Sequence, residues 1–309
     1  MLEGLDAINW SELHHAYGSA ADVPEQIRAL TSSDTAVFDH AIWAMFGNIY
    51  HQGSRREASP YAIPFLCELV NNKSIQKRDE ILNLVLHIGL GDDWSDDEDL
   101  PFDVQHAFSL ADGIVAAQHR DFIQHSYSGE GYTDESGQQL AEQLDMAYQR
   151  DCYLTLEAQA DDLLKWASDA DSSVAMLAIA SFPRFPSLHE QAHPILLKAI
   201  VSDRPVNYKV TALLTVGLIA TYATPDTKAA LQNQLDLQKQ LTTLDAFAIR
   251  LASSIALVFL FDKDAPGSAA ETLIEAEKHR YEMGPLQYKT PYSRPLMGFC
   301  TLALHKLGL

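Results

Sequence analysis

Four segments of this 309-residue chain repeat one arrangement, in which an aspartate precedes a run with apolar residues at helical spacing. The segments are Asp34–Gly47, Asp171–Phe185, Asp203–Gly217 and Asp245–Phe261. In the first, Val37, Ala41, Ala44 and Met45 share one helical face. Aspartate is a preferred N-cap because its carboxylate accepts hydrogen bonds from amides of the first turn. We therefore predict four helices that begin at acidic caps and turn small or apolar side chains towards neighbouring helices.

A second helical segment precedes each repeat. These segments are Val23–Leu30, Leu154–Ala167, His189–Val201 and Thr227–Leu241, and two further predicted pairs are Ala58–Val70 with Arg78–Ile88 and Ala269–Tyr281 with Pro295–Leu307. Asp169 and Asp203, ahead of two successive repeats, lie 34 residues apart, a spacing typical of α-solenoids. We predict an all-α, HEAT/armadillo-like α-solenoid of about six antiparallel helix pairs, forming a single domain over residues 1–309.

One segment, Gly91–Gly137, departs from this pattern. It begins with GDDWSDDEDLP and ends with HSYSGEGYTDESG, both rich in charge and in turn-forming residues. Between these ends, Val104–His119 has helical spacing. We interpret residues 91–137 as an irregular acidic insertion within the solenoid, and loops carry function more often than repeats do. Strand signals are scarce, because no alternating run ends in an Asn-Gly or Asp-Gly turn.

The charge of the chain constrains its partners. Its 42 acidic and 22 basic residues give a formal net charge of −20. Such a surface repels nucleic acid and anionic lipid at long range. We expect a protein or peptide partner of basic character, no nucleic acid and no membrane. The alternative is an acidic surface that only maintains solubility.

The cysteines and the apolar segments indicate a cytoplasmic protein. Cys67, Cys152 and Cys300 are far apart and show no metal-binding spacing, so no disulfide framework is expected. The N-terminal sequence MLEGLDAINWSEL has no basic region followed by an apolar run, so no signal peptide is predicted. The most apolar stretch, Ala246–Phe261, contains Arg250, and we expect it to be too short to span a bilayer.

The N-terminal third resembles a known group of proteins. Trp10, LHHAYGSAADVP (Leu13–Pro24), GNIYHQGS (Gly47–Ser54) and YAIPFLCELV (Tyr61–Val70) resemble bacterial HEAT-repeat-containing proteins. These relatives share the start, an acidic insertion after about two helix pairs, and repeats beyond it. They tend to have Thr and a bulkier residue where this chain has Ser54 and Arg55. The resemblance implies an armadillo-type superhelix with an interaction role, and it transfers no catalytic residues.

The N-terminal pairs also hold the strongest polar cluster. His14, His15, Tyr17 and Asp22 lie in the first segment, and Asn48, Tyr50, His51 and Gln52 lie at the end of the next long helix. If the helices pair antiparallel, these residues meet and form a candidate site for a ligand or a metal. The simpler interpretation, which we favour, is that Gly18 and Gly53 mark helix ends and that these side chains cap them. Catalysis is the weakest of the three interpretations.

The acidic insertion supplies a second set of candidate residues. Asp92, Asp93, Asp96, Asp97, Glu98 and Asp99 lack the EF-hand spacing for Ca²⁺, so we expect a solvated loop or a contact with a basic partner. Trp94, Tyr127 and Tyr132 flank this acidity, either as aromatic anchors of an interface or as loop packing. The candidate binding residues here are Trp94, Asp96 and Asp97. No metal and no cofactor is expected.

These observations favour a binding role. The chain contains no P-loop, GxGxxG, GxSxG or HExxH motif. We predict a non-enzymatic protein-interaction module or adaptor for a basic partner, with an immunity or inhibitor role as its sharper form. The alternative is a HEAT-like enzyme, a DNA glycosylase or a lyase, with its site in the N-terminal helix pairs. A third hypothesis is a self-associating structural subunit, with contacts through Leu296–Leu309.

Overall fold

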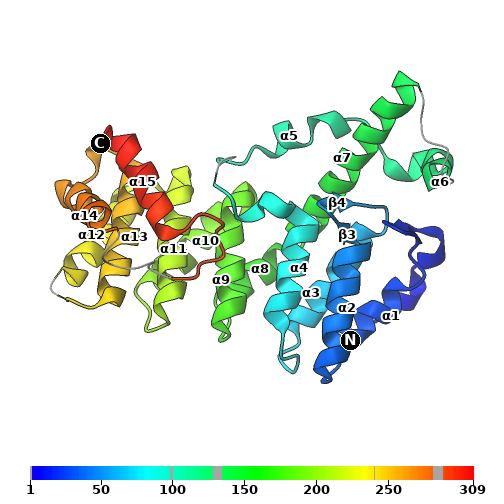
Figure 1. Ribbon diagram of the computed structural model, residues 1–309, viewed down its shortest axis with the longest axis horizontal. Helices are drawn as coiled ribbons and strands as arrows, with labels where there is room; N and C mark the ends of the chain where they lie inside the picture. Colours follow the sequence, from blue (N-terminus) through cyan, green and yellow to red (C-terminus); the bar gives the residue numbers. More distant parts are fainter. Residues whose placement is uncertain (1, 98–99, 128–133, 240, 281–287) are drawn as a thin grey trace. The chain divides into compact units, whose positions relative to one another are not determined.

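In the computed structural model the chain is predominantly α-helical (Figure 1). The structure describes residues 2–97, 100–127, 134–239, 241–280 and 288–309, and within them lie fifteen α-helices and two short β-hairpins. The all-α prediction is therefore confirmed. The chain divides into two compact units, unit 1 with residues 1–94 and 103–162 and unit 2 with residues 95–102 and 163–309. The prediction of one continuous domain stays a prediction.

Unit 1 is built on two helix pairs and one long helix. Its main helices are α1 (Val23–Ala29), α2 (Thr35–Asn48), α3 (Ser59–Asn71), α4 (Arg78–Leu90) and α7 (Glu135–Glu157). Helix α1 packs on α2, α3 packs on α4, and α7 packs against both α3 and α4. The hairpin strands are β1 (His14–His15), β2 (Gly18–Ser19), β3 (Tyr50–His51) and β4 (Ser54–Arg55). Shorter helices are η1 (Leu5–Ala7), η2 (Trp10–Glu12) and η3 (Asp92–Ser95).

Helix α2 begins where its acidic cap predicts. The Asp34 carboxylate accepts hydrogen bonds from the amides of Ala36 and Val37, at 2.9 and 3.4 Å. The buried face of α2 is Phe38, Ala41 and Met45. Val37, which we expected on that face, is 45% exposed. The prediction was wrong there because Phe38 takes the inward position one residue further along the helix.

The acidic insertion is less helical at its centre and more helical at its end than we predicted. The single helix expected over Val104–His119 is divided into α5 (Val104–Ala107), η4 (Ser109–Ala111) and η5 (Ala116–His119), followed by α6 (Arg120–Tyr127). The capping carboxylate of Asp134 accepts from the Gly137 amide at 2.8 Å and starts the 23-residue α7. This helix was predicted only from Leu154 onwards. Ala116, Ile123, Leu144 and Tyr148 form a small core between these elements.

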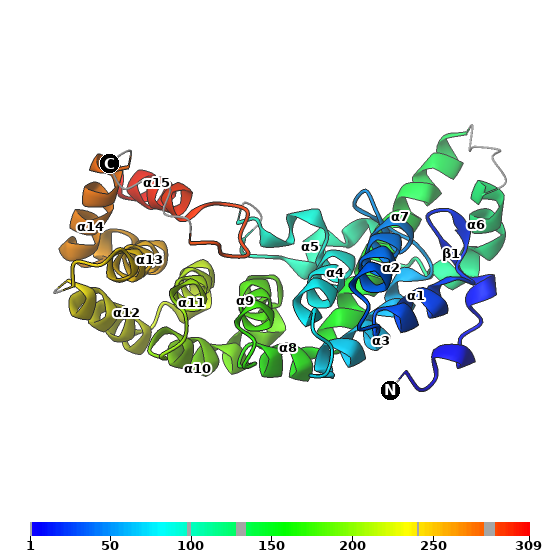
Figure 2. The same cartoon turned by 60° about the horizontal axis from the view of Figure 1, so that its bottom comes forward.

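Unit 2 contains the regular helix pairs. Its helices are α9 (Ser172–Ser181), α10 (His189–Ile200), α11 (Val206–Leu218), α12 (Pro225–Gln238), α13 (Leu244–Phe261), α14 (Gly267–Lys278) and α15 (Leu296–Leu307). Its short helices are η6 (Phe182–Arg184), η7 (Pro186–Leu188), η8 (Ala220–Tyr222) and η9 (Asp262–Asp264), and α8 (Ala160–Trp166) spans the division between the units. Helices α9, α11, α13 and α15 pack successively in one row, while α10 and α12 form a second row against it (Figure 2).

Only some of the predicted acidic caps are caps. Asp171 accepts from the Ser173 amide at 2.9 Å and caps α9 as expected. The expected caps of α11 and α13 were wrong by two residues. The N-cap of α11 is Pro205, and that of α13 is Thr243, whose hydroxyl accepts from the Ala246 amide at 3.2 Å.

Helix α13 forms the centre of unit 2. A Cβ atom added to Gly217 on α11 would lie 2.8 Å from the Cα of Ala256 on α13, so the two backbones pack in direct contact. We expected the apolar segment to be too short to cross a bilayer, but the helix Leu244–Asp264 has 21 residues and meets the requirement by length and composition alone. The protein itself buries 61% of its most apolar window, which is the property of a core helix.

Candidate functional site

Two hairpins, which the sequence did not predict, organise the N-terminal candidate residues. The turn between β3 and β4 has positive φ at both central residues, 50° at Gln52 and 84° at Gly53. A turn of this kind matches the twist of a two-residue hairpin. The Ala16 amide donates to the Asn48 carbonyl at 3.0 Å, which holds the first hairpin against the end of α2. Gly18 and Gly53 therefore lie in hairpins rather than at helix ends, as we had assumed.

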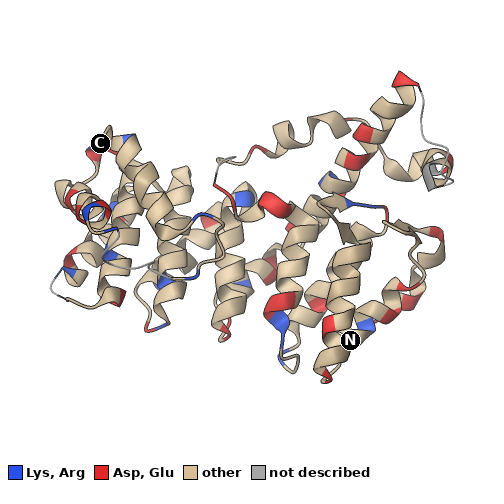
Figure 3. Ribbon diagram, viewed as in Figure 1, with Lys and Arg blue, Asp and Glu red and all other residues tan. Residues whose placement is uncertain are grey.

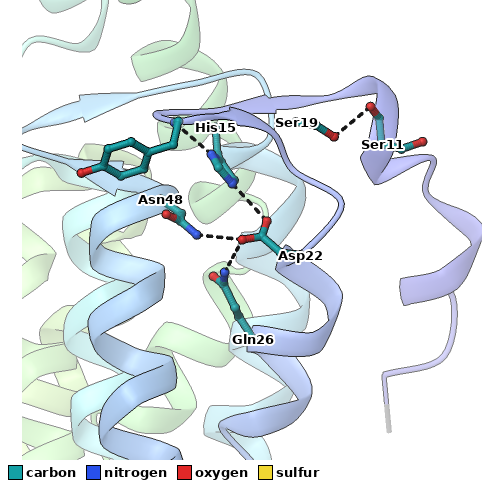
Figure 4. A network of polar contacts seen from close by, with 7 residues as sticks. Ser11, His15, Ser19, Asp22, Gln26 and Asn48 are labelled. Carbon is teal, nitrogen blue, oxygen red and sulfur yellow. Dashed lines mark hydrogen bonds and ion pairs between the residues drawn. The ribbon is translucent and has the colours of Figure 1, made fainter.

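Asp22 lies at the centre of a polar network that we call the Asp22 clasp (Figure 4). One carboxylate oxygen of Asp22 lies 3.0 Å from His15 Nε2. The other accepts from Gln26 Nε2 at 2.7 Å and from Asn48 Nδ2 at 3.2 Å. The structure thus brings three of the predicted residues together, His15, Asp22 and Asn48, and adds Gln26. Asp22 precedes α1 without capping it, since its side chain accepts no hydrogen bond from the first turn.

Both ring nitrogen atoms of His15 are engaged in hydrogen bonds within the clasp. Its Nδ1 accepts a hydrogen bond from the Tyr17 amide at 3.0 Å, so the proton of the neutral ring is on Nε2, which donates to Asp22. The His15 side chain is also buried, with only 6% of it exposed. His15 therefore positions the hairpin, and neither nitrogen is left to act as a base or as a metal ligand.

The other hairpin residues have separate partners. The Tyr17 hydroxyl lies 3.3 Å from His51 Nδ1, and the Tyr17 side chain is 68% exposed. His14 Nδ1 lies 3.2 Å from the Glu57 carboxylate, and the Ala58 amide donates to the His14 carbonyl at 3.0 Å. These contacts join the first hairpin to the segment that leads into α3.

Tyr50 and Trp94 are core residues of unit 1. The Tyr50 ring lies 5.6 Å from the ring of His87, which lies 6.4 Å from that of Trp94, and both aromatic residues are 4% exposed. Burial, with a smaller contribution from the Asp92 carboxylate, raises the pKa of the Tyr50 hydroxyl well above its ordinary value. The interpretation of Trp94 as an exposed interface anchor is therefore wrong, because its indole is needed for packing on α4.

The two acidic candidates of the insertion belong to unit 2. The Asp97 side chain is 8% exposed and accepts from Arg294 Nε at 2.7 Å, and Asp96 hydrogen-bonds Ser293. These carboxylates are engaged by basic and polar groups of the same chain, in place of the solvated loop we expected. Asp92 and Asp93 are exposed, as expected of a solvated segment. The other residues of this prediction, Glu98, Asp99, Tyr132 and the side chain of Tyr127, lie outside the described part of the chain.

A groove of about 560 Å³ runs between α1 and α2. Its lining residues are Glu25, Gln26 and Ala29 from α1 and Ala36, Val37, His40, Ala41 and Ala44 from α2. Trp43 stacks on His40 at 6.2 Å between ring centroids and is 72% exposed, which places a large aromatic surface at the edge of the groove. We expected Ala41 and Ala44 to pack against a neighbouring helix, and the sequence did not single out Trp43 beside them.

The Asp22 clasp fixes one polar atom of this groove. A carboxylate only accepts hydrogen bonds, so the Gln26 amide must turn its NH₂ group towards Asp22. Its carbonyl oxygen, Oε1, is then buried with no hydrogen-bond partner among the residues that the structure describes. A buried acceptor without a donor is costly, but Oε1 is closed off from solvent, so this cost is internal to the clasp and Oε1 is not a contact for a ligand in the groove.

The described residues offer neither a metal site nor a reactive thiol. Over the described residues, no three His, Cys, Asp or Glu side chains converge on a position that could hold a metal ion. Cys67, Cys152 and Cys300 are free thiols in the interior. Burial raises the pKa of all three, that of Cys300 to about 12, so they remain protonated and weakly reactive at neutral pH.

Comparisons with known proteins add no assignment. No family model matches the sequence, and no curated protein or solved structure is significantly similar to it. The resemblance of the N-terminal third to HEAT-repeat proteins therefore stays a prediction, and the function has to be argued from the geometry of the chain.

Proposed function

We propose that the protein is a cytoplasmic protein-interaction module, a HEAT/armadillo-like solenoid without catalytic activity, whose α1–α2 groove binds a basic amphipathic helix of a partner protein. The observation that carries this proposal is the open groove with Trp43 exposed at its edge. The successive packing of helices within unit 2 and the N-terminal resemblance support the solenoid. The occupied nitrogens of His15 argue against catalysis in the N-terminal cluster.

The shape of the groove suits a helix. Ala29, Ala36, Ala41 and Ala44 line it, and small residues let a third helix approach two others closely. Amphipathic helices bind such grooves through apolar residues that recur every three or four positions. Trp43 is well suited to anchor that helix, because exposed tryptophans are enriched among the residues that dominate binding energy.

The charge of the protein favours a basic occupant. The excess of acidic over basic residues lies mainly in unit 1 (Figure 3), and the formal net charge of the chain is −20. At the groove itself, Glu25 is an acidic lining residue, and neither lysine nor arginine lines it. A lysine or arginine of the partner is attracted to Glu25, whereas a second copy of this acidic chain is repelled. This argument favours the adaptor hypothesis over self-association.

Site-specific photo-crosslinking tests the proposal. A benzophenone amino acid is placed at position 43, and the control places it at Leu237, which is 63% exposed on α12 of unit 2. We expect position 43, and not position 237, to capture one basic protein that then binds the purified chain directly. Affinity for that protein should fall with added salt and fall at least tenfold in Trp43→Ala. Equal capture at both positions, or undiminished affinity of Trp43→Ala, would overturn the proposal.

A further inference from the structure

A second cavity, of about 470 Å³, lies in unit 1 between α3, α7 and the segment before η5. Its apolar walls include Ile8, Pro64, Phe65 and Val115. This volume is in the range of pockets that hold small organic ligands. The cavity is separate from the α1–α2 groove, with which it shares no lining residue.

The acidic residues that line this cavity are Glu57 and Asp151, and neither lysine nor arginine lines it. The Glu57 side chain is 8% exposed and is held by His14 Nδ1 at 3.2 Å. A buried carboxylate on an apolar wall binds a cation strongly, because little water competes with the ion pair. The contact with His14 holds the Glu57 carboxyl group in place at the wall of the cavity.

Asp151 is only partly neutralised by its neighbour. Arg150 Nη2 lies 2.8 Å from Asp151 Oδ1, but the same guanidinium donates to the carbonyls of Ala111 at 2.8 Å and Ile114 at 3.0 Å. These bonds fix Arg150 on the backbone of the insertion. Both Arg150 bonds to Asp151 end on Oδ1, and the cavity lining itself holds two carboxyl groups and neither lysine nor arginine.

We propose that this cavity is a binding site for a small organic cation, a primary ammonium group on an apolar body such as an arylalkyl chain. The ammonium lies between Glu57 and Asp151, and the hydrocarbon part packs on Pro64, Phe65 and Val115. This site goes beyond the proposed interaction role and does not depend on it, because no residue of the groove takes part.

Isothermal titration with three matched probes tests the site. The probes are 2-phenylethylammonium, 2-phenylethanol and 3-phenylpropanoate, which share the aromatic body and differ in charge. We expect the ammonium to bind at least tenfold more tightly than the alcohol, and the carboxylate not to bind. Equal binding of the ammonium and the alcohol, or no binding of the ammonium at millimolar concentration, overturns the proposal.

Two charge-removing variants locate the binding. Glu57→Gln and Asp151→Asn should each lower the affinity for 2-phenylethylammonium at least fivefold, whereas Trp43→Ala in the groove should leave it unchanged. Circular dichroism establishes that each variant is folded, and if Glu57→Gln is not, Asp151→Asn decides the test. Unchanged affinity in the folded carboxylate variants overturns the proposal. Loss of partner crosslinking at position 43 with retained ammonium binding removes the proposed function alone.

Discussion

The two units use similar helices in different ways. In unit 2, consecutive helix pairs pack in two rows and contact each other so closely that Gly217 has no room for a Cβ atom beside Ala256. In unit 1, two hairpins precede α1 and α3, and the long α7 packs on both α3 and α4. Both cavities described above lie in unit 1. The comparison shows that the cavity of about 470 Å³ lies where the insertion and α7 depart from the pattern of helix pairs, whereas the groove lies on the α1–α2 pair itself.

The largest expected effect is at the helix contact of unit 2. Gly217→Ala places a methyl group 2.8 Å from the Cα of Ala256, and this backbone atom of α13 cannot rotate away as a side chain could. We expect the free energy of unfolding of unit 2 to fall by about 3 kcal/mol. Hydrogen exchange of the core amides of α11 and α13 measures this.

The matched change in unit 1 should cost less. Gly89→Ala brings a methyl group to 2.3 Å from Cδ2 of Leu156, which is the end of a rotatable side chain, so we expect a loss of about 1–2 kcal/mol. Gly47→Ala is the control, because its Cβ meets nothing within 4 Å, and it should stabilise α2 by up to about 1 kcal/mol. A smaller loss for Gly217→Ala than for Gly89→Ala would contradict the account of tight packing in unit 2.

The next effect concerns the Asp22 clasp. Asp22→Ala removes the acceptor of His15, Gln26 and Asn48, and we expect a loss of about 2 kcal/mol, because hydrogen bonds to a charged group are lost from a half-exposed site. Exchange of the α1 amides should show the change locally. Asp6→Ala, which breaks an exposed pair with Arg28, should cost no more than about 0.5 kcal/mol. Equal losses in the two variants would mean that the clasp does not hold the hairpin.

Filling the groove gives a smaller effect, which acts on binding rather than on stability. Ala44→Leu occupies part of the space between α1 and α2, and we expect the affinity for the crosslinked partner to fall about tenfold, or about 1.4 kcal/mol. Ala229→Leu on the exposed face of α12 is the control and should leave the affinity unchanged. Surface plasmon resonance measures both. An Ala44→Leu protein that binds normally would place the partner elsewhere.

The smallest effect is a pH dependence of unit 2. Burial lowers the pKa of His189 and His193, and the opposing contributions of the Phe182 carbonyl and Asp226 are smaller. The histidines of the unfolded chain bind a proton at about pH 6.5, and those of the folded chain bind it only at a lower pH. Stability from this source is present above that pH and is lost as the pH falls below it. Urea unfolding followed through Trp166 at pH 7.5 and 5.5 measures the loss.

The control for this pH effect is His193→Gln, which removes one of the two titrating groups. The difference in stability between pH 7.5 and pH 5.5 should be smaller in this variant than in the original chain. The comparison cancels the titration of the many carboxylates, which both proteins share. The same difference in both proteins would show that His193 does not contribute.

Much of the helical fold could be predicted from local signals. Asp34 and Asp171 cap their helices, and α3, α4 and α10 begin and end within two residues of the predicted bounds. Such signals act within one helical turn, which is why sequence alone contains them. Helix α7 was missed before Leu154 although Leu144, Ala147, Tyr148 and Cys152 are apolar at helical spacing and buried, so this part of the signal was present in the sequence.

The candidate site was predicted only in part. His15, Asp22 and Asn48 do meet, as the spacing of the N-terminal segments indicated. The hairpins were missed because each strand has two residues and the positive φ at Gln52 comes from a Gln-Gly turn. Trp43 was missed because helical periodicity tells which residues share a face, and whether another helix covers that face depends on the rest of the fold.

The most direct test of the central claim is hydrogen–deuterium exchange of the whole chain with and without the crosslinked basic partner. The account predicts that the partner protects Val23–Ala29 and Thr35–Asn48, the two helices that form the groove. Exchange in α10 and α12 of unit 2 should not change. Protection confined to unit 2, with α1 and α2 exchanging as in the free protein, would contradict the proposal that the irregular unit is the binding unit.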